Sequence, residues 1–345
     1  MKSRLLYAAL GALALTTPVT AQTNPTVYGS VVFGHEWEDM EAPPYGLYSM
    51  PADNGNAIKL EVRNDAIKAN GGGVYVDGMY HLVDFTRYEF EQVVTFRTFD
   101  TKNNWKLINE QTIKSYSSAA SDLTYDPVGD KIYGCFKETA TSTQYFLGTL
   151  NPITGFASKI ADIDEELIVL ASTRDGKLYG VGAYGMLYSV DKQTGKLTKI
   201  GQTGKSVKYS QSATFDYASG RMLWAMTPHY TNESPELCEI DLSTGKTTTL
   251  ATIPERYEFT GIYTLSPYAA DNAPQTATAF GGKYEKGALS GTVSFTAPTA
   301  TMGGSTLSGS LSYTLCVDDK AEQTATGTTT AGETVTLPKQ LSRGT

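Results

Sequence analysis

The stretch Lys177-Leu-Tyr-Gly-Val-Gly-Ala-Tyr-Gly-Met-Leu-Tyr-Ser-Val-Asp-Lys-Gln-Thr-Gly-Lys-Leu-Thr-Lys-Ile200 decides the fold. Apolar and polar residues alternate within it, which is the two-residue period of half-buried strands. The pattern predicts strands at Leu178–Val181, Met186–Val190 and Leu197–Ile200, the last two joined by a tight turn. In that turn Asp191 can accept hydrogen bonds from the amides ahead of it, and Gly195 supplies the positive φ that reverses the chain.

The same turn recurs along the chain, which predicts a repeated unit. Asp241–Gly245 and Asn151–Gly155 share its pattern, and Asp100–Asn104 and Pro51–Gly55 are weaker copies. Asn104 stands where the others have Gly, a replacement that the left-handed region of the backbone tolerates. A strand precedes each turn, and a further strand precedes that one. The period of roughly 40–50 residues is typical of the four-stranded blades of a β-propeller.

One strand is missing at the start of the chain and one is left over after the last turn. The first unit lacks its innermost strand, because Val27 follows the N-terminal segment directly, whereas Phe259–Leu265 has the pattern of such a strand. We therefore predict that this late strand pairs with the strand beginning near Val27 and closes a ring of about five blades. Closure of this kind removes the exposed edge that an open sheet would leave.

Residues 1–21 have the features of a secretory signal peptide. Lys2 and Arg4 precede the apolar run Leu5–Leu15, and Val19-Thr-Ala21 matches a small-residue cleavage site. The apolar run is too short for a membrane span, and no Cys follows Ala21 as a lipid anchor would require. We expect a secreted or cell-surface protein that begins at Gln22 and does not insert into a membrane.

The net charge of the chain limits the classes of partner that it can bind. The formal net charge of −8 becomes about −10 once the two basic residues of the signal segment are removed. An acidic chain without a basic patch is a poor ligand for nucleic acid, whose binding depends on neutralising phosphates. No cofactor motif or metal-ligand spacing is present, so we expect neither a cofactor nor a metal ion.

The three cysteines lie far apart, each within a predicted strand. We interpret Cys135, Cys238 and Cys316 as small buried apolar residues. The alternative for an exported protein is a disulfide between Cys135 and Cys238.

The C-terminal part of the sequence differs in character from the repeats. We predict a propeller over residues 22–267, a linker over 268–274 and a second domain over 275–345. The second domain resembles a fibronectin type III domain, since Val293-Ser-Phe-Thr-Ala-Pro298 and Tyr313-Thr-Leu-Cys-Val-Asp-Asp319 match its second and third strands. Phe295 stands where many members have Trp. Such a sandwich needs around 100 residues, so we expect a partial domain and a truncated gene product.

Taken together, the signal segment, the repeats and the trailing domain resemble exported propeller–fibronectin proteins of Bacteroidetes-type bacteria. The resemblance covers nearly the whole mature chain. It implies an all-β architecture and a surface or adhesion role. Its motifs specify architecture far better than they specify a ligand.

Binding is expected on one face of the propeller. The repeated turns are short and alike, whereas the connections on the opposite face are long, irregular and rich in aromatic residues. Loops on a rigid scaffold often carry binding function, and Tyr and Trp offer large contact areas with a polar group. The alternative is that these aromatics only pack on one another. The predicted ligand-binding residues are Trp37, Tyr45, Tyr88, Tyr116, Tyr209, Tyr230 and Tyr257.

The favoured function is a non-catalytic exported binding or adhesion protein whose partner is an extracellular glycan or protein. A second reading is an enzyme resembling propeller glycoside hydrolases, which use two carboxylates about 5–10 Å apart. Its candidate residues are Glu36, Glu38, Asp39, Asp122, Glu166 and Glu258. None of them carries a local signature of that group, so no catalytic residue is assigned. A third reading is a passive surface spacer, and the oligomeric state is left open.

Overall fold

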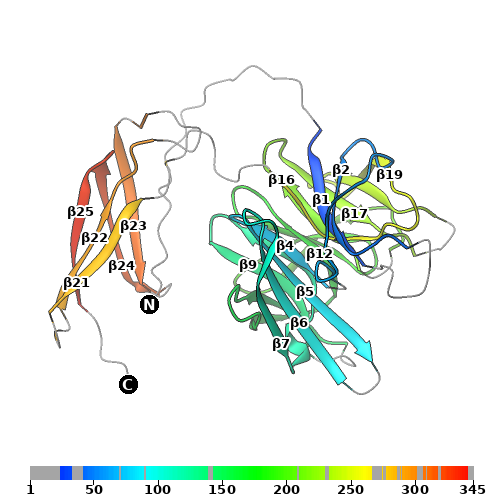
Figure 1. Ribbon diagram of the computed structural model, residues 1–345, viewed down its shortest axis with the longest axis horizontal. Coiled ribbons are helices and arrows are strands. Elements are labelled where there is room, and N and C mark those ends of the chain that lie inside the picture. The colour runs from blue at the N-terminus through cyan, green and yellow to red at the C-terminus, as the bar shows by residue number, and fades with distance from the viewer. Residues whose placement is uncertain are drawn as a thin grey trace. The chain divides into compact units, whose positions relative to one another are not determined.

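The computed structural model of the chain describes residues 24–32, 42–69, 71–88, 91–138, 143–207, 210–229, 233–265, 274, 277–285, 288, 290–300, 306–307, 309–317 and 320–340. These residues fall into two compact units, one within 21–268 and the other within 269–345. Apart from one short 3₁₀ helix, η2 (Tyr116–Ser118), the described elements are all strands (Figure 1). The described residues contain no helix with the length and apolar character that crossing a membrane requires.

The first unit consists of four-stranded antiparallel sheets. Its strands are β1 (Thr26–Val31), β2 (Gly46–Pro51), β3 (Lys59–Arg63), β4 (Gly73–Val76), β5 (Met79–Tyr88), β6 (Glu91–Asp100), β7 (Lys106–Ile113), β8 (Ala120–Asp126), β9 (Lys131–Lys137), β10 (Tyr145–Leu150), β11 (Ala157–Ile163), β12 (Leu167–Ser172), β13 (Leu178–Gly182), β14 (Met186–Val190), β15 (Leu197–Gln202), β16 (Ser212–Asp216), β17 (Arg221–Met226), β18 (Glu236–Ile240), β19 (Thr247–Thr252) and β20 (Phe259–Thr264). The sheets are, in chain order, β20-β1-β2-β3, β4-β5-β6-β7, β8-β9-β10-β11, β12-β13-β14-β15 and β16-β17-β18-β19, and we call them the first to the fifth sheet.

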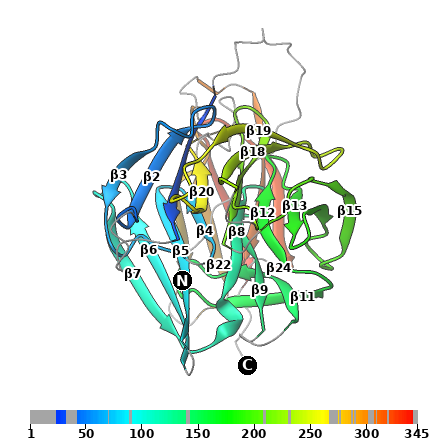
Figure 2. The ribbon, with the colours of Figure 1, turned by 90° about the vertical axis from the view of Figure 1, so that its right-hand side faces the viewer.

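The innermost strands of these sheets pack in a circle, which makes the unit a β-propeller. β20 packs on β4, β4 on β8, β8 on β12, β12 on β16, and β16 returns to β20. The outer strands β3, β7, β11 and β15 lie at the periphery (Figure 2). Among the inner strands, β12 and β20 are buried along their whole length.

The predicted closure of the ring is confirmed. β20 pairs antiparallel with β1, from Val27 opposite Thr264 to Val31 opposite Phe259. The first sheet is thus completed by a strand from the far end of the propeller sequence. This pairing covers the edge of β1 that the chain leaves open at its start.

The repeated turns have the predicted geometry. Asp191 Oδ1 accepts hydrogen bonds from the amides of Gln193 at 2.8 Å and Thr194 at 2.9 Å, and Asp241 and Asn151 act in the same way. Gly195 has a φ of 69° and Gly245 one of 78°. Each glycine also lies close to the preceding sheet, because a Cβ on Gly245 would be 2.5 Å from the Gly201 carbonyl oxygen.

Of the two weaker copies, one follows the predicted geometry and one does not. Asn104 has a φ of 52°, as a left-handed turn residue should. Gly55 does not adopt a positive φ; instead, a Cβ there would lie 2.0 Å from the carbonyl oxygen of Thr252. Glycine at this position permits close packing of the first sheet on the fifth.

We predict that Gly195→Val or Gly245→Val lowers the free energy of unfolding by more than about 1 kcal/mol, because a β-branched residue resists positive φ and its side chain would clash with the neighbouring sheet. Asn104→Gly is the matched control and should be neutral or mildly stabilising. Urea denaturation of the three variants measures the effect. A negligible change in both valine variants would mean that these turns tolerate other backbone conformations.

The second unit contains β21 (Thr278–Tyr284), β22 (Ser290–Thr296), β23 (Ser310–Val317), β24 (Lys320–Thr330) and β25 (Thr334–Gln340). One sheet has the order β21-β22-β25, and β23 pairs with β24 in another. Phe295 of β22 meets Tyr313 of β23 edge to face, with ring centroids 5.2 Å apart. The sequence pattern predicts strands at 286–296, 311–319 and 333–337, which overlap β22, β23 and β25, and it gives no indication of β21 or β24.

Candidate functional site

The propeller has two faces with different connections. The loop face carries the links between sheets and those between second and third strands of a sheet. On it the amide of Ala183 donates to Glu166 O at 3.0 Å, and the amide of Thr203 donates to Gly185 O at 2.9 Å. The turn face carries the remaining hairpin turns, including the repeated ones.

The axis of the ring is occupied by Asp122, one of the carboxylates considered for catalysis. It lies on β8 and is fully buried. Its Oδ2 accepts from the amides of Leu170 at 3.0 Å and Ala213 at 3.1 Å, and its Oδ1 accepts from Ser212 Oγ at 3.0 Å. Ser212 Oγ in turn accepts from the amide of Ile262 at 3.0 Å. A single side chain therefore connects, directly or through Ser212, the inner strands β8, β12, β16 and β20.

The same surroundings set the charge of Asp122. Burial raises its pKa to about 8, although the hydrogen bonds from Leu170, Ala213 and Ser212 oppose that rise. The three groups that donate hydrogen bonds to it, from Leu170, Ala213 and Ser212, all belong to the ring itself. We conclude that Asp122 is a structural carboxyl group and not a group that faces a ligand.

Other buried polar and reactive groups are likewise engaged within the fold. His81 is stacked on Phe96, its Nδ1 lies 2.9 Å from Thr98 Oγ1, and burial lowers its pKa to about 4. Cys135 and Cys238 are free and buried, which confirms their interpretation as packing residues and excludes the alternative disulfide between them. Burial raises the pKa of both thiols to about 12, so neither is a thiolate nucleophile at neutral pH.

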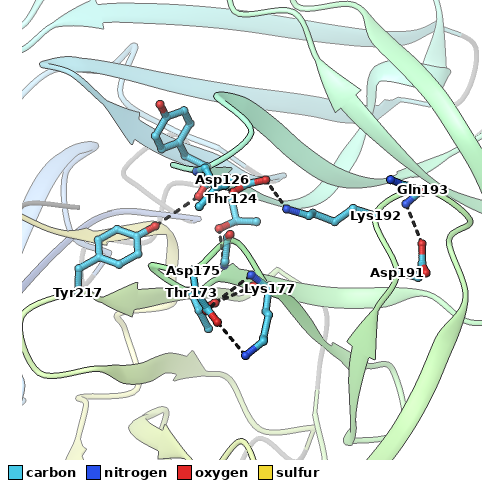
Figure 3. Close-up of polar contacts among 12 residues, drawn as sticks. Thr124, Asp126, Thr173, Asp175, Lys177, Asp191, Lys192, Gln193 and Tyr217 are labelled. Carbon is cyan, nitrogen blue, oxygen red and sulfur yellow. Dashed lines mark hydrogen bonds and ion pairs between the residues drawn. The ribbon is translucent and has the colours of Figure 1, made fainter. Parts of the chain in front are cut away.

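The turn face is held together by contacts between its own turns (Figure 3). Lys192 Nζ, in the turn of the fourth sheet, lies 2.5 Å from Oδ2 of the buried Asp126 in the third. Tyr217 of the fifth sheet donates to Tyr125 O of the third at 3.4 Å. Burial, followed by the charge of Asp126, raises the pKa of Tyr217. Because these contacts join different sheets, they stabilise the ring.

On the loop face of the first sheet, two predicted tyrosines pack beneath basic side chains. Lys68 Nζ lies 4.8 Å from the ring centroid of Tyr45, and Arg256 Cζ lies 5.4 Å from that of Tyr257. Tyr257 also stacks on Phe259, with ring centroids 6.3 Å apart. Tyr45 is only 5% exposed, so its ring supports this surface and does not itself offer a stacking face. Tyr257 is partly exposed.

On the loop face of the fourth sheet, carboxylates adjoin a short turn. Glu165 accepts a hydrogen bond from the hydroxyl of Tyr188, and Glu166 Oε1 accepts from Ser121 Oγ at 3.1 Å. The turn Gly182–Gly185 lies against both glutamates, through the Ala183–Glu166 backbone bond and through Gly182, where a Cβ would be 2.0 Å from Glu165 Oε1. Its tip is Tyr184, which is 83% exposed.

The remaining predicted residues are placed as follows. Tyr88 ends β5 and Tyr116 begins η2, and the structure describes only their backbone. Trp37, Tyr209 and Tyr230 lie outside the described residues, as do Glu36, Glu38 and Asp39. Among the described residues, no group of three His, Cys, Asp or Glu side chains is placed to hold a metal ion. Tyr184 was not among the predicted residues, because these all lie in the long connections, whereas Tyr184 lies in a short turn between Gly182 and Gly185.

No family model matches the sequence, and no curated protein matches it. Among solved structures, the chain is similar to an auxiliary nutrient binding protein from Bacteroides ovatus, with 13% identity and a TM-score of 0.36, over 80% of this chain and 61% of that one. It is similar to a gluconolactonase from Xanthomonas campestris, with 11% identity and a TM-score of 0.39, over 85% and 95%. It is also similar to an α-L-arabinofuranosidase from Podospora anserina, with 10% identity and a TM-score of 0.36, over 68% and 86%. At these TM-scores none of the three assigns an activity or a ligand to this chain.

Proposed function

We propose that the chain is an exported binding protein whose propeller captures an extracellular glycan or protein on its loop face. In this proposal residues 1–21 are a signal peptide, residues 22–267 form a five-bladed propeller, and a linker at 268–274 leads to a fibronectin type III-like domain at 275–345. The five four-stranded sheets support the blade count. In the second unit, β21, β22 and β25 form one sheet, and β23 pairs with β24 in another. This division into two sheets supports a sandwich of the fibronectin type III kind.

The observation that carries the binding role is the contrast between the two faces. On the turn face, Asp126, Lys192 and Tyr217 are engaged with neighbouring turns, and the repeated turns are nearly alike. On the loop face the connections differ in length and sequence, and Tyr184 and the Arg256–Tyr257 pair reach its surface. Aromatic side chains with polar neighbours on a rigid scaffold are typical of recognition surfaces.

The acidic composition guides the choice of partner. A chain with a net charge of −8 is poorly suited to nucleic acid or to an anionic membrane surface. Glycans and exported proteins are the partners that an extracellular protein meets, and both are bound through aromatic contacts. The proposal therefore keeps Trp37, Tyr88, Tyr116, Tyr209, Tyr230 and Tyr257 as ligand contacts, with Tyr45 as a supporting residue.

The full chain, probed on an array of glycans and extracellular matrix proteins, tests this proposal. We expect Trp37→Ala and Tyr230→Ala, which change the connections between β1 and β2 and between β17 and β18, to weaken capture by about 1–2 kcal/mol each if they are hot spots. Their melting temperatures should stay close to that of the parent.

Phe156→Ala is the matched control, because this aromatic is 54% exposed and follows a repeated turn on the opposite face. It should leave capture unchanged. Loop variants that bind as well as the parent, or that lose stability in place of binding, would show that these aromatics serve packing.

A further inference from the structure

Three tyrosine rings form a stack where the closing strand β20 meets β1 and β4. Tyr263 of β20 stacks on Tyr75 of β4 and on Tyr28 of β1. Its ring centroid is 4.7 Å from that of Tyr75, with the ring planes 7° apart, and 5.3 Å from that of Tyr28, with the planes 19° apart. Nearly parallel rings at 4.7 Å are in face-to-face contact, at the short end of the range for aromatic pairs.

The fold uses the rings of this stack but not their hydroxyls. Within the described part of the chain, the hydroxyls of Tyr28, Tyr75 and Tyr263 form no hydrogen bond. A fourth ring, Tyr80, lies 5.3 Å from Tyr263 and does use its hydroxyl, which donates to Gly261 O at 2.7 Å. The three stacked phenol groups are therefore chemically available, whereas that of Tyr80 is part of the core.

The stack joins the protein surface to its interior. Tyr28 and Tyr75 are partly exposed, whereas Tyr263 is only 5% exposed. An oxidant in solution can take an electron from an outer ring, and the buried ring exchanges electrons with the outer ones through their contact. Burial, followed by the neighbouring phenols of Tyr80, Tyr75 and Tyr28, raises the pKa of Tyr263. Its phenol is therefore neutral at ordinary pH and loses its proton together with the electron.

We propose that Tyr75 and Tyr263 are a site of oxidative dityrosine formation, which joins the closing strand covalently to the second sheet. A one-electron oxidant of the peroxidase class takes one electron from each phenol, and each phenol releases a proton to solvent. The two phenoxyl radicals join through a C–C bond between ring carbons next to the hydroxyl-bearing carbons. The hydrogen on each of these carbons then moves to the phenol oxygen, so the product keeps both hydroxyls and has lost two hydrogen atoms.

The position of the pair gives this link a consequence for stability. Tyr263 lies on the strand that closes the ring, and Tyr75 lies on the innermost strand of the next sheet, on which β20 packs. The link would enclose most of the propeller sequence, and a long enclosed loop restricts the unfolded chain more than a short one. The cross-linked protein should therefore melt at a higher temperature. This inference goes beyond the proposed binding role and does not depend on it.

Treatment of the full chain with a peroxidase and hydrogen peroxide, at low protein concentration, tests the link. We expect a monomer that has lost two hydrogen atoms and shows dityrosine fluorescence. Tandem mass spectrometry of its tryptic digest should find Tyr75 joined to Tyr263. Tyr75→Phe keeps the ring and should abolish this product, while its melting temperature before oxidation stays close to that of the parent. Tyr28→Phe should leave the product in place.

Tyr257→Phe is the matched control, because Tyr257 meets Tyr48 edge to face, with ring centroids 5.6 Å apart, and lacks the parallel contact. It should give the same yield of cross-linked monomer as the parent. An oxidised parent without the Tyr75–Tyr263 link would overturn the proposal. Dityrosine formed only between molecules, and lost in Tyr184→Phe, would also overturn it and assign the chemistry to the exposed Tyr184. A cross-linked monomer that melts no higher than the parent would refute the stabilising role.

Discussion

A chain that ends at Glu258 should lose cooperative unfolding, whereas a chain that ends at Pro267 should retain it. The two differ by β20, whose six residues are all buried. Removing Phe259, Ile262 and Tyr263 sacrifices about 1.5–3 kcal/mol of burial for each large side chain. That loss is comparable with the whole stability of a typical domain, about 5–15 kcal/mol. It also uncovers the edge of β1, whose partner is β20.

Differential scanning calorimetry of the two truncated chains measures this effect. The comparison separates β20 from the C-terminal unit, which both chains lack. A synthetic peptide covering residues 259–267, added to the shorter chain, should restore part of the transition. Equal melting curves for the two chains would contradict closure of the ring by β20.

The second large effect is expected at Asp122. Asp122→Leu removes the acceptor for two backbone amides, those of Leu170 and Ala213, and for the Ser212 hydroxyl. A buried donor left without a partner costs about 1–3 kcal/mol, so the total should exceed about 3 kcal/mol. Asp122→Asn keeps the shape of the side chain and one acceptor oxygen, so it should lower the free energy of unfolding by less than Asp122→Leu does. Urea denaturation of both variants at one pH gives this ranking.

Asp122 also makes stability depend on pH with a defined sign. Its pKa is about 8 in the folded chain and its ordinary value is 3.8. Between these values the unfolded chain has released the proton that the folded chain still holds, so the free energy of unfolding falls as pH rises. The slope contributed by one such group is on the order of 1 kcal/mol per pH unit. Below pH 4 this contribution is complete, and above pH 8 it is lost.

Asp122→Asn is the control for that dependence, because it cannot titrate. Between pH 5 and pH 8 the parent should lose more stability than the variant. Identical changes in the two proteins would mean that Asp122 ionises in the folded chain at its ordinary pKa. In that case the hydrogen bonds from the surrounding donors would fully offset the effect of burial on the pKa.

Local signals in the sequence predicted the repeating part of the fold. The Asp191–Gly195 turn and its copies were predictable because a carboxylate acceptor and a left-handed glycine act within five residues. Strands β21 and β24 were not, since Thr278–Tyr284 and Lys320–Thr330 are rich in Thr, Gly and Ala and lack apolar alternation. The missing first strand of the first sheet was enough to predict the role of Phe259–Thr264.

The candidate site was less predictable because it depends on contacts between distant segments. The sequence identified Asp122 only as one of several candidate carboxylates, because the amides that donate to it, those of Leu170 and Ala213, are 48 and 91 residues away in sequence. Whether a tyrosine is exposed is a tertiary property as well. Tyr45, in a long connection, is buried beside Lys68. Tyr184, in the short turn Gly182–Gly185, is exposed.

Hydrogen–deuterium exchange of the full chain, with and without the ligand that the array identifies, tests the central claim most directly. The loop-face account predicts slower exchange on binding in peptides from the connections between second and third strands and between sheets, including 164–166 and 182–185. Peptides from the repeated turns at 151–155, 191–195 and 241–245 should exchange as before. Protection confined to those turns, or to residues 278–340, would contradict the account.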